Sequence, residues 1–363
     1  MRMVGFVFGS ILMIIAIGIL MMQDKKVETN VTLHRTKVAV IMNGSRNDHS
    51  WSESHYEAME KVADRLNLEV LYYENVSEDS LTERIMESAI KKGARIVVAN
   101  SFGFGKTVMR MAEKYPEVKF IHASGIDYKS NVSTFFGRIY QMRYLSGIVA
   151  GLTTKTNEIG YVAAFDISEV NRGINAFALG VAKVNPEAKV FVGWSHSWED
   201  SALAADATND LINKHNIDVL TVHVDALSPY DIAEHRNIRM IGYNLDNGNR
   251  FPRTFMTAPV WRWENYYSPK IMAILQDKFV GDHAWLGVDS DIIGLAPMTA
   301  LVPDSARKIV DVEFERLKSG AYDVFYGPIE DNHGDVRVND GESMTDVDML
   351  EHFDWYVKGV VNE

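Results

Sequence analysis

Short β-branched segments alternate with segments of helical period along most of the chain, and this alternation limits the possible folds more than any other feature. Lys37–Met42 reads KVAVIM, which is typical of a buried parallel strand. The next segment, Ser52–Leu66, places Ala58, Met59 and Val62 on one face of a helix. Repeated strand–helix units of this kind form parallel sheets that helices cover on both faces. The sequence therefore predicts an α/β fold with doubly wound sheets.

The alternation occurs in two similar halves, which predict two lobes. In the first half, the next predicted elements are Leu68–Tyr73, Ser80–Lys92, Arg95–Ala99, Lys106–Lys114 and Lys119–His122. After a helix over Tyr140–Leu152, the second half predicts Ile159–Ala163, Asn171–Val184, Lys189–Trp194, Ser201–His215, Val219–Val224, Tyr230–Arg236 and Arg239–Tyr243. We assign residues 37–152 with 262–300 to the first lobe, and residues 153–261 with 301–363 to the second. Hinges are expected near residues 150–156, 256–262 and 294–304.

Charge and residue usage exclude several functional classes. Lys and Arg total 37 against 49 Asp and Glu, a net charge of −12, so the chain is a poor partner for nucleic acid. Cysteine is absent, which excludes disulfides, thiolate metal sites and cysteine nucleophiles. His49 and His55 lack the spacing of a helical metal pair, and no carboxylate set accompanies them. We therefore expect no metal, no cofactor and no catalytic set.

An uncharged apolar segment occupies Met3–Met22. About 20 apolar residues are enough to cross a bilayer as a helix, and no convincing small-x-small cleavage site stands at the end of this segment. Residues 1–22 are interpreted as a signal sequence or an uncleaved membrane anchor, and the polar residues 23–36 as a tether. Either interpretation places the rest of the chain outside the cytoplasm.

Large aromatic residues and polar side chains follow the predicted strands. Ligands of parallel α/β sheets bind at this carboxyl end of the strands. The aromatic residues at these positions are Trp51, Phe102, Trp198, Trp261 and Trp263. Aromatic faces bind flat rings, and nearby Asp or Asn side chains can read the ring edge by hydrogen bonds. The repetition favours a planar heteroaromatic ligand. The alternative is that these aromatic residues pack the hinge or the lobe surfaces.

Several segments resemble the basic membrane protein family. They read GSRNDHSWSESHYEAME, NSFGF, FIHASG, FFGRIYQMRYLSGIVAGL, SEVNRGINAFALGV, VNPEAKVFVGWSHSWED and FYGPIEDNHGDVRVNDGE followed by DWYVKGV, and the similarity runs from Lys37 to Val360. Members of this family are substrate-binding proteins of ABC-type importers with a periplasmic-binding-protein type I fold, and many bind purine bases or nucleosides. The resemblance implies an extracytoplasmic binding protein that delivers a purine to ABC permease subunits. A sensor that signals to a membrane partner, or a nucleoside hydrolase, is the alternative.

The resemblance also implies a set of ligand contacts. Trp51 and Phe102 would stack on the base, and the cleft would be lined by Asp48, Asn100, Glu169, Asn175, Trp198, Asp225 and Asn244. The strand ending at Ala258 would bring Trp261 and Trp263 into the cleft. Nucleoside-binding members have a lysine at the position of Trp261 and an aspartate at that of Asn244. Both replacements remove groups suited to a ribose, so a free base is the expected ligand.

Overall fold

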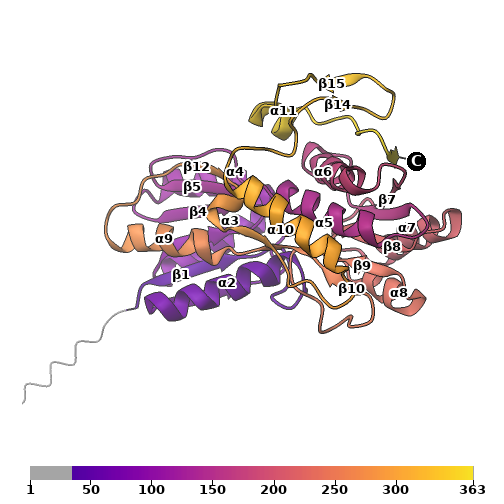
Figure 1. Cartoon of the computed structure of the whole chain (residues 1–363). Helices are drawn as coiled ribbons and strands as arrows, with labels where there is room; N and C mark the ends of the chain where they lie inside the picture. Colours follow the sequence, from indigo (N-terminus) through magenta and orange to yellow (C-terminus); the bar gives the residue numbers. More distant parts are fainter. Residues whose placement is uncertain (1–34, 363) are drawn as a thin grey trace, which may run out of the picture. The chain divides into compact units, whose positions relative to one another are not determined.

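Two six-stranded parallel sheets organise residues 35–362, the part of the chain that the computed structural model describes (Figure 1). We call the two sheets with their helices the first and second lobe. The predicted apolar segment 3–22 lies outside the described residues. Within residues 35–362, no helix is both long and apolar enough to cross a bilayer.

The two sheets share the order of five of their six strands. The first contains β1 (Lys37–Ile41), β2 (Glu69–Tyr73), β3 (Ala94–Ala99), β4 (Lys119–Ala123), β5 (Val132–Gly137) and β12 (His283–Leu286). The second contains β6 (Glu158–Ala163), β7 (Lys189–Trp194), β8 (Val219–His223), β9 (Arg239–Ile241), β10 (Phe255–Thr257) and β16 (Val360–Asn362). The order β2-β1-β3-β4-β5 corresponds to β7-β6-β8-β9-β10, which is the doubly wound arrangement expected from the sequence. The sixth strands lie at opposite edges, because β12 pairs with β5 and β16 pairs with β7.

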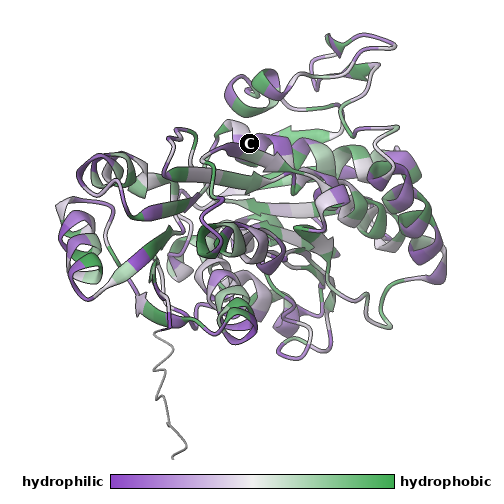
Figure 2. Ribbon diagram, turned by 90° about the vertical axis from the view of Figure 1, so that its left-hand side faces the viewer, coloured by the Kyte–Doolittle hydropathy of each residue, from purple (hydrophilic) through white to green (hydrophobic). Residues whose placement is uncertain are grey.

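Helices cover both faces of each sheet. In the first lobe these are α2 (Trp51–Leu66), α3 (Ser80–Lys91), α4 (Gly105–Lys114) and α9 (Glu264–Leu275). Alternate residues of β1 enter different cores: Val38 and Val40 join the core that contains α2, whereas Ala39 and Ile41 join the core that contains α3 and α4. Figure 2 shows the hydrophobic strands between helices whose outer faces are hydrophilic. The second lobe carries α6 (Ser168–Val184), α7 (Ser201–Lys214) and α8 (Ser228–Arg236).

Besides the short 3-10 helices η1 (Phe102–Phe104) and η2 (Val288–Ser290), residues 35–362 contain three further α-helices and two short ribbons. The helices are α5 (Tyr140–Thr153), α10 (Asp304–Lys318) and α11 (Asp346–Glu351), and the ribbons pair β11 (Pro259–Trp261) with β13 (Ile293–Leu295) and β14 (Ile329–Glu330) with β15 (Val336–Val338). The C-terminal segment packs on α6, where Asn171 Nδ2 donates to Phe353 O at 3.0 Å and Arg172 Nη1 donates to Met349 O at 2.5 Å. The predicted lobe boundaries and hinge segments stay predictions.

Most predicted elements end within two residues of the observed ones, but the predicted start of α6 is wrong. This helix begins at Ser168, three residues before the predicted Asn171. Its first turn carries Ser168 and Glu169, which are not apolar, so the hydrophobic period does not include them. The segment between β4 and α5 also forms a buried strand, β5, which has no counterpart among the predicted elements.

Two glycines allow α5 and α6 to touch at their backbones. A Cβ atom on Gly147 of α5 would lie 2.1 Å from the carbonyl oxygen of Phe177, and one on Gly180 of α6 would lie 1.9 Å from that of Tyr144. Neither distance is compatible with a side chain unless the helices separate. Because α5 links β5 of one sheet to β6 of the other, this contact fixes the segment that joins the lobes.

We predict that Gly180→Ala lowers the free energy of unfolding by about 1–3 kcal/mol, the usual result of overpacking a close contact. Chemical denaturation measures this value. Ala182→Ser, an exposed position on the same helix, is the control and should change it by no more than about 0.5 kcal/mol. Equal stabilities of the two variants would contradict the described helix contact.

Candidate functional site

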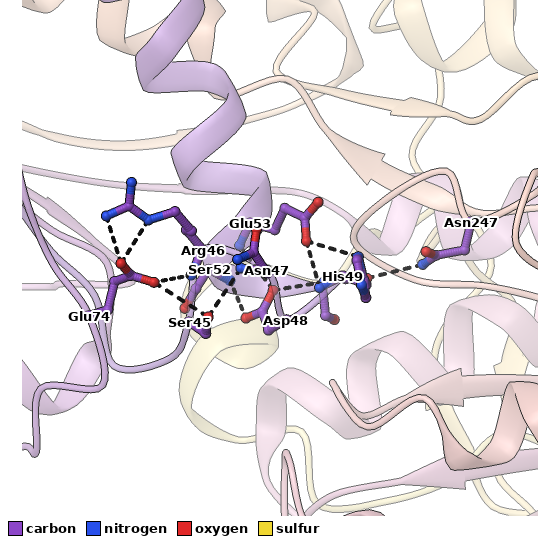
Figure 3. A network of polar contacts seen from close by, with 10 residues as sticks. Ser45, Arg46, Asn47, Asp48, His49, Ser52, Glu53, Glu74 and Asn247 are labelled. Atoms are coloured by element: carbon purple, nitrogen blue, oxygen red, sulfur yellow. Dashed lines mark hydrogen bonds and ion pairs between the residues drawn. The ribbon is translucent and has the colours of Figure 1, made fainter.

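The loop between β1 and α2 is held in place by the carboxylate of Asp48. Its Oδ1 accepts from the backbone N–H groups of Ser50 at 2.8 Å and Glu53 at 3.0 Å, and its Oδ2 accepts from that of Ser52 at 2.8 Å. These bonds satisfy otherwise unpaired donors in the first turn of α2 and place a negative charge at the positive end of the helix dipole. Figure 3 shows this network. The loop thus presents Ser50 and Trp51 in a fixed orientation.

Ser50 joins the first lobe to two residues of the second. Its hydroxyl donates to Asp225 Oδ1 at 2.8 Å and accepts from Asn244 Nδ2 at 2.8 Å. Asn244 Nδ2 also donates to Asp225 Oδ1 at 2.7 Å, so the three side chains form a closed ring of hydrogen bonds. Beside it, Asn247 Nδ2 donates to the carbonyl oxygen of His49 at 3.0 Å (Figure 3). Polar groups that follow β1, β8 and β9 therefore meet where the two lobes touch.

An aromatic cluster lies on the first-lobe side of this contact. Trp261 Nε1 donates to Asn244 Oδ1 at 2.7 Å, and its ring stacks on Trp263 with centroids 4.2 Å apart. Trp51 meets Trp261 edge to face at 5.8 Å, and its Nε1 donates to the carbonyl oxygen of Asn100 at 2.9 Å. The indole N–H groups of Trp51 and Trp261 are thus already bonded, which leaves ring faces and edges as the surfaces available to a ligand.

Acidic groups of the second lobe gather beside the ring of hydrogen bonds. Burial, and next the negative charge of Asp48, raise the pKa of Asp225 from 3.8 to about 7, although the hydrogen bond from Ser50 opposes the shift. Burial also raises the pKa of Glu169, against the attraction of Arg172 and Arg143. Such carboxyl groups can accept hydrogen bonds from a ligand when ionised and can donate one when protonated.

The structure brings seven of the predicted residues into or beside the lobe contact. These are Asp48, Trp51, Glu169, Trp198, Asp225, Asn244 and Trp261. Trp198 belongs to this group because its carbonyl oxygen accepts from the backbone N–H of Asp225 at 2.6 Å. Whether they contact a ligand stays a prediction.

The other predicted residues have different surroundings. Asn100 is buried and binds the backbone N–H of Asn43 and the hydroxyl of Ser52. Asn175 is buried against the C-terminal segment, where it bonds Trp355 O and Val357 N. Trp263 has no exposed surface and donates to Ser54 Oγ. Phe102, in contrast, is 63% exposed in the loop after β3. The side chains of Asn100, Asn175 and Trp263 therefore pack inside the protein, whereas the ring of Phe102 is accessible to a ligand.

Two residues of this region were not identified from the sequence. Ser50 had no distinguishing signal, because loop serines are common. Arg143 did have one: it is the only charged residue of α5, a helix that is otherwise almost wholly buried. A charged side chain in such a helix is rare and calls for a specific partner. Among residues 35–362, no group of three His, Asp or Glu side chains could hold a metal ion.

The pKa of Asp225 predicts a pH-dependent stability. The pKa is higher in the folded than in the unfolded protein. The contribution of this carboxyl group to the free energy of unfolding is therefore fully present below about pH 4 and is lost as the pH rises through about 7. From about pH 5 to about pH 8, the free energy of unfolding of the ligand-free protein should fall by about 1–3 kcal/mol more than that of Asp225→Asn. Denaturation curves across this range measure it, and parallel pH profiles would contradict the shift.

Comparisons with known proteins agree with this architecture. Residues 35–319 match the family described as "ABC transporter substrate-binding protein PnrA-like". A purine-binding protein of Brucella abortus is 32% identical over 90% of this chain and 93% of its own length. A Haloferax volcanii protein named as a candidate glucose-binding protein of an ABC transporter is 32% identical over 79% of this chain and 73% of its own.

A solved structure shows the same fold. The solute-binding protein of an ABC transporter from Conexibacter woesei superimposes with a TM-score of 0.69 at 22% sequence identity, and the match covers 79% of this chain and 98% of that one. The two parallel sheets of this chain, each covered by helices, form the periplasmic-binding-protein type I fold expected from the sequence. The family match covers most of the described residues and includes strands of both sheets. The chain therefore belongs to the PnrA-like (basic membrane protein) family of ABC transporter substrate-binding proteins.

Proposed function

We propose that this protein binds a purine base between its lobes, outside the cytoplasm, and delivers it to an ABC permease. The observation that carries the proposal is the lobe contact, in which Asp225 and Asn244 of the second lobe meet Ser50 beside the tryptophan cluster of the first. Carboxylate and amide groups suit the polar edge of a heteroaromatic ring, and tryptophan suits its faces. The 32% identity to a purine-binding protein over 90% of this chain supports the same ligand class.

We assign direct ligand contacts to Trp51, Phe102, Glu169, Trp198, Asp225, Asn244 and Trp261. Asp48 and Asn100 act as positioning residues, because their side chains hold the backbone of the loop after β1 and the start of α2. Asn175 and Trp263 support the fold around the site, since both are buried and fully engaged with protein groups.

The surroundings of Trp261 favour a free base over a nucleoside. Its single donor is bonded to Asn244, and its side chain is 6% exposed. A ribose placed against this indole would lose hydrogen bonds to water and find no replacement, because the ring has no acceptor and its donor is occupied. Each unpaired buried polar group costs about 1–3 kcal/mol. The site is therefore suited to a ligand whose polar atoms lie on a flat ring.

Transport would use two further features. The lobes would close over the base by bending at hinges in the predicted segments 150–156, 256–262 and 294–304. The permease would then recognise the closed arrangement of the two lobes. The apolar segment 3–22 would tether the protein to the membrane beside its permease. Fractionation of cells that express the full chain tests the tether, because a soluble form that begins after Met22 would show cleavage.

The ligand class is tested by calorimetric titration of the ligand-free protein. We predict that adenine, guanine, hypoxanthine or xanthine binds at least about tenfold more tightly than its own riboside. Glucose serves as the competing ligand class, because one relative is named for glucose binding. If a riboside binds more tightly than its base, the ligand is a nucleoside and not a free base. Binding of glucose with no binding of any purine would reject the proposal.

The exposed ring of Phe102 provides a test that separates binding from stability. Loss of one stacking face typically costs about 1–3 kcal/mol, so Phe102→Ala should weaken binding of the purine base about 10- to 100-fold. Because the side chain is 63% exposed, its removal should leave the free energy of unfolding within about 0.5 kcal/mol of the original value. Val280→Ala, at a 72% exposed position, is the matched control for removal of an exposed apolar side chain. Equal affinities of the two variants would remove Phe102 from the site.

A further inference from the structure

Arg143 places a positive charge inside the protein next to the proposed site. Its side chain has no exposed surface. Nη1 donates to the carbonyl oxygen of Val222 at 2.7 Å, and the guanidinium carbon lies 4.0 Å from the centroid of the Tyr243 ring. Val222 is near the end of β8, three residues before Asp225, and Tyr243 directly precedes Asn244. The guanidinium therefore lies at the carboxyl end of the second sheet, against the chain segments that carry Asp225 and Asn244.

Two donors of this guanidinium have no partner. Within residues 35–362, Nε and Nη2 of Arg143 are buried and make no hydrogen bond. These two nitrogens lie on the same edge of the planar group, so together they form the fork that binds two adjacent acceptors at once. Buried donors are nearly always paired, because leaving one unpaired costs free energy. An intact, unused fork beside the site points to an acceptor pair that comes from outside the described chain.

The groups around this fork do not supply that pair. Glu169 of α6 attracts Arg143 electrostatically, but its carboxylate makes no hydrogen bond or ion pair with a side chain or backbone group of residues 35–362. The imidazole of His223 has an unpaired Nε2 as well, and its Nδ1 lies 3.1 Å from the hydroxyl oxygen of Tyr161. The His223 ring also lies 5.9 Å from that of Trp198. Unpaired buried nitrogens of Arg143 and His223, together with the carboxylate of Glu169, thus lie near the same end of the second sheet.

We infer that Arg143 is a specificity-determining residue whose fork binds two adjacent acceptors on a 6-oxopurine. In their 9H tautomers, hypoxanthine, guanine and xanthine carry the O6 and N7 acceptors side by side, which is the pair that arginine binds bidentately. Adenine places an amino donor at C6 beside N7, so one arm of the fork would face another donor. Glu169 then accepts from an N–H group of the same base. This inference rests on the proposed purine function and narrows its substrate class.

The first experiment changes only the ligand. Calorimetric titration of the ligand-free full chain compares hypoxanthine with adenine and with 7-deazahypoxanthine, which lacks the N7 acceptor. We expect adenine and 7-deazahypoxanthine each to bind about 10- to 100-fold more weakly than hypoxanthine. A water molecule on the fork in place of the base would leave hypoxanthine and its 7-deaza analogue with equal affinities, and that result would overturn the inference.

The second experiment changes the protein. Arg143→Lys keeps the charge but replaces the fork by a single ammonium group, so hypoxanthine should lose at least about tenfold in affinity while adenine changes less than about threefold. Arg172→Lys is the matched control, because Arg172 is also a buried arginine of a neighbouring helix, and its Nη1 is bonded to Met349. This control should leave the ratio of the two affinities unchanged. Equal losses for both bases in Arg143→Lys would overturn the assignment.

The outcomes separate this inference from the function on which it rests. If adenine binds as tightly as hypoxanthine or more tightly, the role of Arg143 is rejected, but purine binding stands. If no purine binds the original protein, the proposed function itself fails. Because the comparison of ligands uses the unaltered chain, it decides the role of Arg143 even where Arg143→Lys does not fold.

Discussion

The hydrogen-bonded ring of Ser50, Asp225 and Asn244 is the interaction on which the rest of the site depends. It connects residues that lie 175 and 194 positions apart in the chain. Asp48 holds the loop after β1 against the start of α2, and this loop presents Ser50 to the second lobe. The same ring brings Asp225 near Asp48, which together with burial raises its pKa. The charge state of the site is thus a consequence of the lobe contact.

Two packing features hold the lobes in position to make this contact. The backbones of α5 and α6 meet at Gly147 and Gly180, and this places the segment that connects the first sheet to the second. The other crossing segments pair with each other, because β11 and β13 form an antiparallel ribbon in which Pro259 lies opposite Leu295. Trp261 is on this ribbon and donates a hydrogen bond to Asn244. A movement of the crossing strands would therefore displace this indole relative to Asn244.

The fold was predictable from the sequence to a greater extent than the site. Buried parallel strands such as Lys37–Ile41 carry an unbroken β-branched pattern, and their neighbouring helices have a clear apolar face. The first turn of α6 was missed because Ser168 and Glu169 are polar, although they are helical.

In the site, the tryptophans were recognisable by their position after strands. Trp263 is buried, and Asn175 is hydrogen-bonded to the C-terminal segment. Both features depend on tertiary contacts, which the spacing of residues in the sequence does not reveal. Arg143 was detectable as the lone charge of an apolar helix, but its unused fork was not.

A crystal structure of the protein with hypoxanthine tests the central claim, the position of the ligand at the lobe contact, most directly. The base should lie between the tryptophan cluster and the carboxyl end of the second sheet, within hydrogen-bond distance of Asp225 or Asn244. A base bound elsewhere, for example in the cavity of about 410 Å³ beside Arg95, Lys119 and Phe279, with the Ser50–Asp225 hydrogen bond intact, would contradict it.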